Sequence, residues 1–539
     1  MAELRLTGRV ASSGFAAGPV ALLLNSNSGN RSVGNPVAEA QALHRAIAAA
    51  LSELSDLAAN AEGDGAEILA FQIAMLEDDT LAEPAFAMIA AGASADQGWR
   101  KALDDEIAGY EAADDEHFKG RAGDLKDISE RVLADLFGAT AKPGPPAGAI
   151  IVGEDMTPSR FLATDWSRGG GIALTRGSAS GHVATLARSR GIPMIVGLPL
   201  DLSGVAGSRE AFIDGESATL CIDPAPDTRD DFAARAKAAD RASNAWAEFA
   251  TRPAMTGDGT AITVCLNIAD PAEIEGLDPA SCDGIGLVRT EFLFSGRAGL
   301  PDEETQYRGY RRLAEWAVGK PVTIRTLDAG ADKPIAGLTL EHEANPFLGL
   351  RGIRLSLHKP DPFLTQLRAL CRAAAHGRVE VMLPMVTLPS ELDRARVYLD
   401  EAFCSLQDAG IACRRPALGM MVEVPAAALT VESFDADFFS IGSNDLTQYA
   451  MAAARDSDAV AALNDPTHPA VLRLIAQVAA HGASVARKVS LCGDAGGEPK
   501  FIEALLATGL RALSVSPAAL GRTKQAIARV GLSRGAPDD

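Results

Sequence analysis

Short apolar runs alternate with longer amphipathic segments along the second half of the chain. After residue 255 there are eight such runs, each separated from the next by a segment long enough for a helix. This alternation predicts parallel strands joined by helical crossovers. Eight units within residues 255–539 favour a closed (β/α)8 TIM-type barrel, in which both faces of every strand are covered. The runs begin at residues 261, 284, 322, 379, 417, 437, 489 and 512.

The first half of the chain changes its pattern several times. Residues 1–24 predict a strand, a glycine turn and a strand, whereas residues 36–140 are rich in alanine, leucine and glutamate at helical spacing. An α/β pattern follows KPGPPAG, and a polar helix follows DPAPD. Because the opening strands have no sheet of their own, we expect them to pair with the later α/β part. The predicted regions are an α/β domain (1–28 and 142–226), an inserted all-α domain (29–141), a linker helix (227–254) and the barrel (255–539).

Polar residues occur in the later half of five of the barrel runs. Parallel strands of a barrel all end at the same mouth, so side chains at these positions are expected to converge where active sites of this fold lie. A random distribution of charge would not favour one end of the strands. The residues are Arg289, Glu291, Arg325, Asp328, Glu423, Asn444, Asp445 and Cys492.

The residue types at this mouth indicate a ligand with several anionic oxygens. A guanidinium group matches phosphate and carboxylate through paired hydrogen bonds, and a lysine adds a point charge. Glu423 and Asp445 would supply hard oxygen ligands for Mg²⁺. Two interpretations stay open: arginines that pair with acids and only close the rim, or a site for a small acid bearing phosphate and carboxylate. The candidate cations are Arg289, Arg325, Lys333, Arg351 and Arg455.

One of the 8 histidines lies among small side chains. In GSASGHVATLAR, residues 177–188, His182 has no bulky neighbour before Leu186. Such residues suit a strand-to-helix turn with Ser178 or Ser180 as the N-cap. A histidine there is commonly a turn or cap residue, but the open surroundings also suit an imidazole that meets a phosphoryl group carried by another domain. Both can hold, because a helix N-terminus attracts anions.

Composition narrows the class of protein. The chain has 539 residues, 47% hydrophobic and 22% charged, as expected for a globular protein of several domains. Its net charge of -21 argues against a general nucleic-acid or membrane-surface binder. Seven single cysteines without a CxxC pair indicate a reducing cytosol, with neither disulfides nor a zinc site. No apolar run approaches the length of a membrane span, so membrane insertion is not expected.

Two groups of segments, collinear over nearly the whole chain, carry a resemblance to a known family. The later group is GLVRTEFLF, IRTLDAGADK, NPFLGLRGIR, MLPMV, GMMVEVPAAA, FFSIGSNDLTQYAMAAAR and LCGDAGG. The earlier group is ASSGFAAGPV, MLEDDTL, GDLKDISERVL, DMTPS and GHVATLARSRGIPMIVG. The later group resembles the phosphoenolpyruvate-binding barrel of enzyme I of the bacterial phosphotransferase system. The earlier group is similar to that family's opening segment, carrier-binding helices and phosphohistidine domain.

The resemblance implies a phosphohistidine α/β domain with an inserted carrier-binding domain, followed by the barrel. It implies a cytoplasmic, homodimeric enzyme that moves a phosphoryl group from phosphoenolpyruvate to His182 and then to a small carrier protein, HPr or a relative, releasing pyruvate. By residue, Arg289, Arg325, Asn444 and Arg455 fall on phosphoenolpyruvate-binding positions, and Lys333 and Arg351 line the same site. Glu423 and Asp445 fall on Mg²⁺ positions, and Cys492 falls on the proton donor to the enolate carbon.

Two alternatives share parts of this resemblance. A pyruvate phosphate dikinase or phosphoenolpyruvate synthase has the same phosphohistidine and barrel modules but needs an ATP-binding domain, for which the sequence shows no Gly-rich phosphate loop. A phosphoenolpyruvate-responsive regulator with low transfer activity would not need the full set of site residues found here. Ser180 and Gly181 stand before His182, where the family usually has Thr-Ser or Thr-Cys, which bears on the transfer rate or the carrier.

Overall fold

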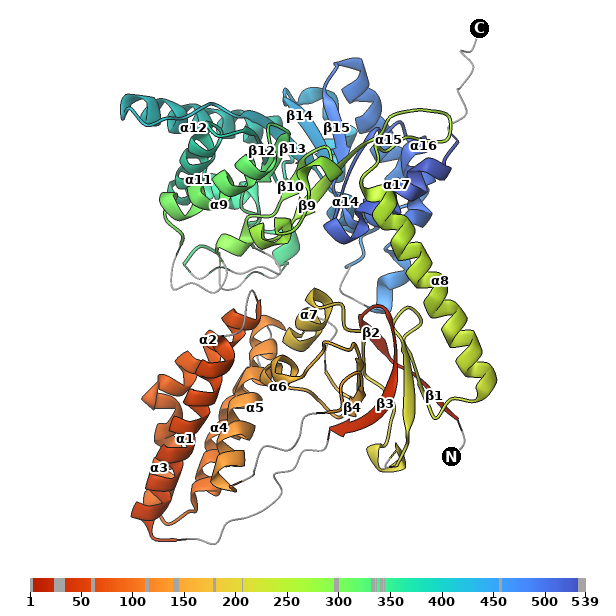
Figure 1. The fold of residues 1–539 in the computed structure, drawn as a ribbon. Coiled ribbons are helices and arrows are strands. Elements are labelled where there is room, and N and C mark those ends of the chain that lie inside the picture. Colours follow the sequence, from red (N-terminus) through yellow and green to blue (C-terminus); the bar gives the residue numbers. More distant parts are fainter. Residues whose placement is uncertain are drawn as a thin grey trace. The chain divides into compact units, whose positions relative to one another are not determined.

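The chain forms two units, Met1–Asp240 and Arg241–Asp539, each with its own hydrophobic core. The computed structural model in Figure 1 describes residues 3–23, 34–59, 64–111, 116–138, 145–177, 181–205, 207–294, 300–330, 335, 337–339, 343, 345–454 and 458–531. No helix in these ranges is both long and apolar enough to cross a membrane.

One mixed sheet organises the first unit, with the strand order β1-β8-β7-β3-β4-β5-β6-β2. Strand β3 (Phe15–Leu23) joins its two halves: the first residues pair antiparallel with β7 (Glu210–Asp214), and the last pair parallel with β4 (Ile150–Gly153). Strands β1 and β2 pair antiparallel with β8 and β6, so the N-terminal segment supplies both edges of the sheet. The remaining strands are β1 (Leu4–Thr7), β2 (Arg9–Ser12), β5 (Gly171–Leu174), β6 (Met194–Val196) and β8 (Thr219–Ile222).

Five helices follow β3 along the chain and pack side by side around a core of their own (Figure 1). Fully buried leucines and Trp99 fill this core, as the helical spacing of apolar residues predicts. The helices attach to the α/β part through Asp127, whose carboxylate accepts hydrogen bonds from the backbone N–H (2.8 Å) and hydroxyl (2.6 Å) of Ser159. The helices of the first unit are α1 (Pro36–Ala58), α2 (Asp64–Glu77), α3 (Asp79–Ala90), α4 (Ala95–Glu111), α5 (Glu116–Leu136), α6 (Pro158–Ala163) and α7 (His182–Ser189).

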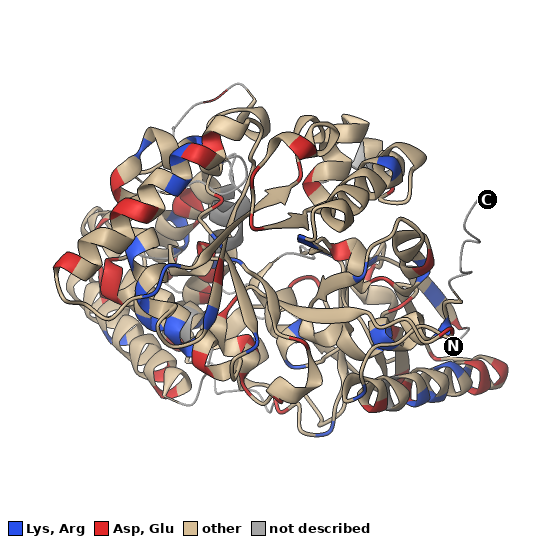
Figure 2. Cartoon of the chain, turned by 90° about the horizontal axis from the view of Figure 1, so that it is seen from above, with Lys and Arg blue, Asp and Glu red and all other residues tan. Residues whose placement is uncertain are grey.

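Helix α8 (Pro226–Ala250) continues from the first unit into the second. Acidic and basic residues alternate along it, as Figure 2 shows, which is typical of a helix that presents much of its surface to solvent. Its last turn is fixed to the barrel by Lys524, whose ammonium donates to the carbonyls of Ala250 and Arg252 (2.8 Å each) and of Ser281 (2.6 Å).

The second unit is a closed barrel in which each of the eight predicted runs forms one strand, which confirms the predicted fold class. The strands are β9 (Thr263–Ile268), β10 (Ile285–Val288), β11 (Pro321–Arg325), β12 (Arg378–Leu383), β13 (Ala417–Val422), β14 (Phe438–Ile441), β15 (Lys488–Leu491) and β16 (Ala512–Val515). The helices are α9 (Glu303–Trp316), α10 (Ile353–His358), α11 (Pro360–Ala373), α12 (Pro389–Asp408), α13 (Pro425–Leu429), α14 (Ser443–Met451), α15 (Pro469–Ser484), α16 (Ile502–Ala507) and α17 (Leu520–Arg529).

Candidate active site

A cavity of about 230 Å³ lies at the carboxyl ends of the barrel strands. Most of the barrel residues predicted from the sequence line it together: Arg289, Arg325, Arg351, Glu423, Asn444, Asp445 and Cys492. Leu287, Asp328, Met421, Gly442 and Gly493 complete the wall. Lys333 and Arg455, also predicted for this site, lie outside the described residues.

Arg351 is 1% exposed and lies between two carboxylates. Its Nε and Nη2 donate to Asp328 (3.0 Å each), and Nη1 and Nη2 donate to the two oxygens of Asp445 (3.2 and 3.1 Å). Nη1 also donates to the Tyr449 hydroxyl at 3.2 Å. Burial alone would lower the pKa of Arg351, but Asp328 and Asp445 raise it, so the charge is fixed. All five N–H groups of this guanidinium therefore have protein acceptors, and Arg351 orients the two carboxylates instead of offering a donor to a ligand.

Arg325 and Arg289 are placed differently. Arg325 donates to Glu291 (2.9 Å) and pairs with Asp328 (3.0 Å), yet its buried Nε–H has no acceptor within the described residues. Burial lowers the pKa of Arg325, but Glu291 and Asp328 outweigh it and keep the group charged. Arg289 forms no ion pair within the described part of the chain. A buried donor without a partner, beside an unpaired cation, indicates a place for an anionic ligand.

Glu423 and Asp445 crowd two carboxylates into this enclosed space. Burial, followed by the charges of Asp445 and Asp328, raises the pKa of Glu423 to about 8. The Met385 N–H donates to Glu423 Oε1 at 2.7 Å from a left-handed backbone (φ 59°), a conformation that costs a non-glycine residue energy and commonly marks functional sites. A side chain at Gly442 would lie 2.8 Å from Glu423 Oε2, so glycine keeps that oxygen accessible.

These two carboxylates fit Mg²⁺. Hard oxygen ligands that repel each other in a buried site gain from a divalent cation between them. No group of three or more His, Cys, Asp and Glu side chains among the described residues forms a cage for a metal. That suits Mg²⁺, which keeps water and substrate oxygens in its shell and commonly takes one or two carboxylates from the protein.

Cys492 follows strand β15 and is 2% exposed. It belongs to a buried apolar cluster with Leu287, Met382, Met421 and Phe438, and its thiol points at the Ile441 carbonyl at 3.6 Å. Burial raises the pKa of Cys492 to about 11. The group is therefore a protonated thiol at neutral pH, beside an apolar wall that suits a carbon atom of a ligand, and it can donate a proton.

His182 is the first residue of α7 in the first unit. The predicted serine cap at Ser178 or Ser180 is wrong: Gly181 is the N-cap, without a side-chain hydrogen bond, and Ser178–Ser180 lie outside the described residues. Gly181 has the extended backbone (φ −69°, ψ 166°) that is usual for an N-cap residue. The ring is partly exposed, and its Nδ1 lies 3.2 Å from the buried Oδ1 of Asp124 on α5.

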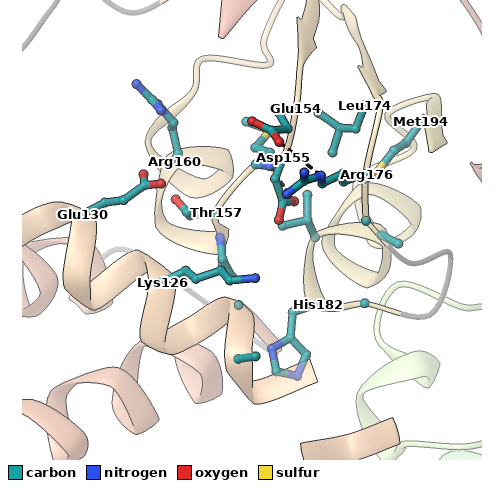
Figure 3. A pocket seen from close by; sticks show the side chains of 18 residues that line it. Lys126, Glu130, Glu154, Asp155, Thr157, Arg160, Leu174, Arg176, His182 and Met194 are labelled. Atoms are coloured by element: carbon teal, nitrogen blue, oxygen red, sulfur yellow. Dashed lines mark hydrogen bonds and ion pairs between the residues drawn. The ribbon is translucent and has the colours of Figure 1, made fainter. Parts of the chain in front are cut away.

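His182 also lines a cavity of about 330 Å³ between α5, α6 and α7. Figure 3 shows Lys126 and Glu130 entering it from α5, with Glu154, Asp155 and Arg176 on the other wall. Arg176 pairs with Glu154 at 3.1 Å. Burial raises the pKa of both Glu130 and Asp155. Three cations (Lys126, Arg160 and Arg176) and three carboxylates (Glu130, Glu154 and Asp155) line this cavity together with the N-terminus of α7, so its side chains carry no excess of positive charge.

Some residues of both sites were not singled out as site residues from the sequence. Asp328 was visible as a polar residue at a strand end, and only the structure gives it a role, as the shared partner of Arg325 and Arg351. Asp494 exchanges hydrogen bonds with the Asn444 side chain (2.8 and 3.0 Å) and fixes its orientation. Its signal was its place two residues after Cys492. Asp124 lies in GDLKDISERVL, a segment that resembles the family's carrier-binding helices, and nothing in the sequence indicated its contact with His182.

Comparison with known proteins places the chain in a family. Three family models of the PEP-utilising enzymes match it: the N-terminal model at residues 7–121, the mobile domain at 145–218 and the PEP-binding domain at 243–532. The phosphoenolpyruvate-protein phosphotransferases of Bacillus sp. (strain S) and Geobacillus stearothermophilus are each 36% identical to it, over 95% of this chain and 91% of theirs. The protein of that name from Haloferax volcanii is 39% identical, over 76% of this chain and 72% of its own. The chain therefore belongs to the PEP-utilising enzymes, in the phosphoenolpyruvate-protein phosphotransferase family.

Proposed function

We propose that this chain is a phosphoenolpyruvate-protein phosphotransferase that phosphorylates itself on His182 and passes the group to a histidine of a small carrier protein. The observation that carries the proposal is the barrel cavity, where three groups converge: Arg289, which forms no ion pair within the described residues, a buried Arg325 Nε–H and a buried thiol. Together they match an acid that carries phosphate, carboxylate and a carbon that must be protonated. No observation favours a dikinase or a regulator.

The substrate is held by charge. Arg289 and Arg325 bind the phosphate and carboxylate oxygens of phosphoenolpyruvate, and Lys333 and Arg455, by resemblance, add to this set. Asn444, oriented by Asp494, offers its remaining amide N–H. Arg351 holds Asp445 in place beside Glu423. These two acids would hold Mg²⁺, which when bound neutralises charge on the phosphate and on the enolate oxygen.

Phosphoryl transfer to His182 forms one bond to phosphorus and breaks one. The Nε2 lone pair of His182 attacks phosphorus, and the bond from phosphorus to the enol oxygen breaks, leaving an N-phosphorylated imidazole and the enolate of pyruvate. The enolate carbon then takes the proton of the Cys492 thiol to give pyruvate, and the thiolate regains a proton from solvent. Asp124 selects Nε2 as the nucleophile, because it accepts the proton of Nδ1.

The second acceptor and the assembly complete the proposal. The carrier is HPr or a relative, and it docks on helices α1–α5, next to which His182 lies. The enzyme is a cytoplasmic homodimer through the barrel, without nucleic-acid or membrane partners. Sedimentation with and without phosphoenolpyruvate and Mg²⁺ tests the dimer, and a monomer at every concentration would contradict it.

Labelled phosphoenolpyruvate tests the whole proposal. The protein is incubated with it and Mg²⁺, and candidate carriers are then added one at a time. The labelled phosphoryl group should first appear on the protein and then move to one of the carriers. Pyruvate should form in an amount equal to the phosphoryl group transferred. His182→Gln should abolish labelling, whereas His481→Gln on barrel helix α15 should not. Labelling that is independent of His182 would contradict the proposal.

A further inference from the structure

Strand pairing in the barrel is sparse on one side of Cys492. Strands β15 and β16 pair at a single position, Leu491 with Leu513, whereas β11 and β12 pair at five positions. On the opposite side, the Cys492 N–H donates to the Ile441 carbonyl at 3.0 Å and extends the pairing of β14 with β15. A regular strand ladder therefore supports the Cys492 backbone on the β14 side only.

The amide of Asn267 bridges the other side. Asn267 is the second-last residue of β9, and its Nδ2 donates to the Cys492 carbonyl at 2.9 Å and to the Ser514 carbonyl at 3.1 Å. Both acceptors are carbonyl oxygens, so the amide group can satisfy them only with its nitrogen toward them. One side chain thus ties the end of β15 to β16 and β9 where the strand pairing stops.

We propose that Asn267 is a positioning residue for proton transfer by Cys492. This inference rests on the proposed function. The sulfur is bonded to Cβ, so a single side-chain torsion separates it from the backbone, and it lies 3.6 Å from the Ile441 carbonyl within a buried cluster. The position of the sulfur therefore follows the Cys492 peptide, which Asn267 holds through the carbonyl.

Proton transfer to carbon is sensitive to such a displacement. A general acid has to come within hydrogen-bond reach of the atom that it protonates, and an error of about 1 Å can cost about a hundredfold in rate. Phosphoryl transfer between carrier and His182 uses neither Cys492 nor the barrel cavity. Loss of the Asn267 amide should therefore slow proton transfer to the enolate carbon and leave phosphoryl transfer between the carrier and His182 unchanged.

The test is a double-mutant cycle between Asn267→Ala and Cys492→Ala. Deuterium uptake into the methyl group of pyruvate is measured in D₂O with phosphorylated protein and Mg²⁺, and phosphoryl transfer from the carrier to His182 is measured in parallel. Gln477→Ala is the matched control, since its amide also donates to a backbone carbonyl, that of Leu429 (2.8 Å), but at an exposed site on α15.

We expect Asn267→Ala to slow uptake by about tenfold or more and to leave transfer from the carrier unchanged. In the Cys492→Ala background the same substitution should change uptake by less than about twofold, because the group that it positions is gone. Asn267→Ser disturbs packing less and should show the same defect if the alanine variant folds poorly.

Equal loss of uptake with and without Cys492 would overturn the inference and assign Asn267 to barrel stability alone. Uptake at the parent rate in Asn267→Ala would overturn it as well. If the parent protein catalysed no deuterium uptake into pyruvate, this result would overturn the proposed function itself, and the inference with it. The parent and Gln477→Ala measurements therefore separate a failure of the inference from a failure of the function.

Discussion

The Nδ1 atom of His182 lies 3.2 Å from Oδ1 of Asp124, a residue 58 positions earlier in the chain. Asp124 belongs to α5 of the helical insertion and is fully buried, while His182 opens α7 of the α/β part. An ionised carboxylate only accepts hydrogen bonds, so this contact places the proton on Nδ1 and leaves the Nε2 lone pair for reaction. The helical insertion thus contributes a group to the proposed phosphorylation site.

Asp124→Ala should slow phosphorylation of His182 by roughly tenfold to a hundredfold, because the imidazole loses the acceptor that fixes its tautomer. Nitrogen NMR of the ring provides a direct readout: the parent should show the proton on Nδ1, and the variant should shift it toward Nε2. Asp135→Ala, at an exposed acid of the same helix, is the control and should change neither quantity. An unchanged tautomer in Asp124→Ala would contradict this role.

Cys492→Ala should retain binding of phosphoenolpyruvate but lose most of the turnover and of the methyl-proton exchange of pyruvate, by roughly a hundredfold. Because burial raises the pKa of the Cys492 thiol to about 11, the parent should also resist alkylation there. At pH 8, iodoacetamide should label the exposed Cys404 and leave Cys492 unmodified, as peptide mapping would show. Exchange at the parent rate in the alanine variant would leave Cys492 as a packing residue.

Glu423→Gln should abolish phosphorylation by phosphoenolpyruvate and leave transfer from phosphorylated carrier to His182 intact. Equal loss of both would indicate misfolding. The pKa of Glu423 is raised to about 8, so Mg²⁺ must displace a proton at lower pH. The affinity of the protein for Mg²⁺ should therefore increase as the pH rises from 6 to 8. Binding at the lower pH should release a proton, which calorimetry in two buffers can measure. An affinity independent of pH would contradict this assignment.

Arg351→Ala should destabilise the barrel by about 3–5 kcal/mol, because it leaves two buried carboxylates, Asp328 and Asp445, without their shared partner. Arg308→Ala removes an exposed ion pair with Glu304 and should cost less than about 1 kcal/mol. Chemical denaturation of both variants measures the difference. Similar free energies of unfolding would show that Arg351 is not the central link of this network.

The sequence predicts the barrel and the residues that lie at its mouth, because both follow from the alternation of apolar runs and helical segments. An apolar run buried on both faces can be little other than an interior strand, and the residue after it must lie at the mouth. The contacts within the mouth do not follow from periodicity. Whether Arg351 faces a ligand or two acids depends on side-chain conformations and on charges that arrive from separate strands.

Other features depend on how distant segments pack. Asp124 reaches His182 only because α5 lies against the α/β part, which Asp127 and Ser159 secure. The bridge from Asn267 matters only where the pairing of β15 with β16 stops. The helix cap before His182 was mispredicted because serine is the better cap in general, whereas α7 begins at His182 and so makes Gly181 the cap.

Localisation of the phosphoryl group tests the central claim most directly. The protein is treated with phosphoenolpyruvate and Mg²⁺, digested under conditions that preserve acid-labile phosphate, and analysed by mass spectrometry. The account predicts phosphate on His182, with pyruvate formed in equal amount and the label lost in acid. Phosphate on His376 or His468, with none on His182, would contradict it.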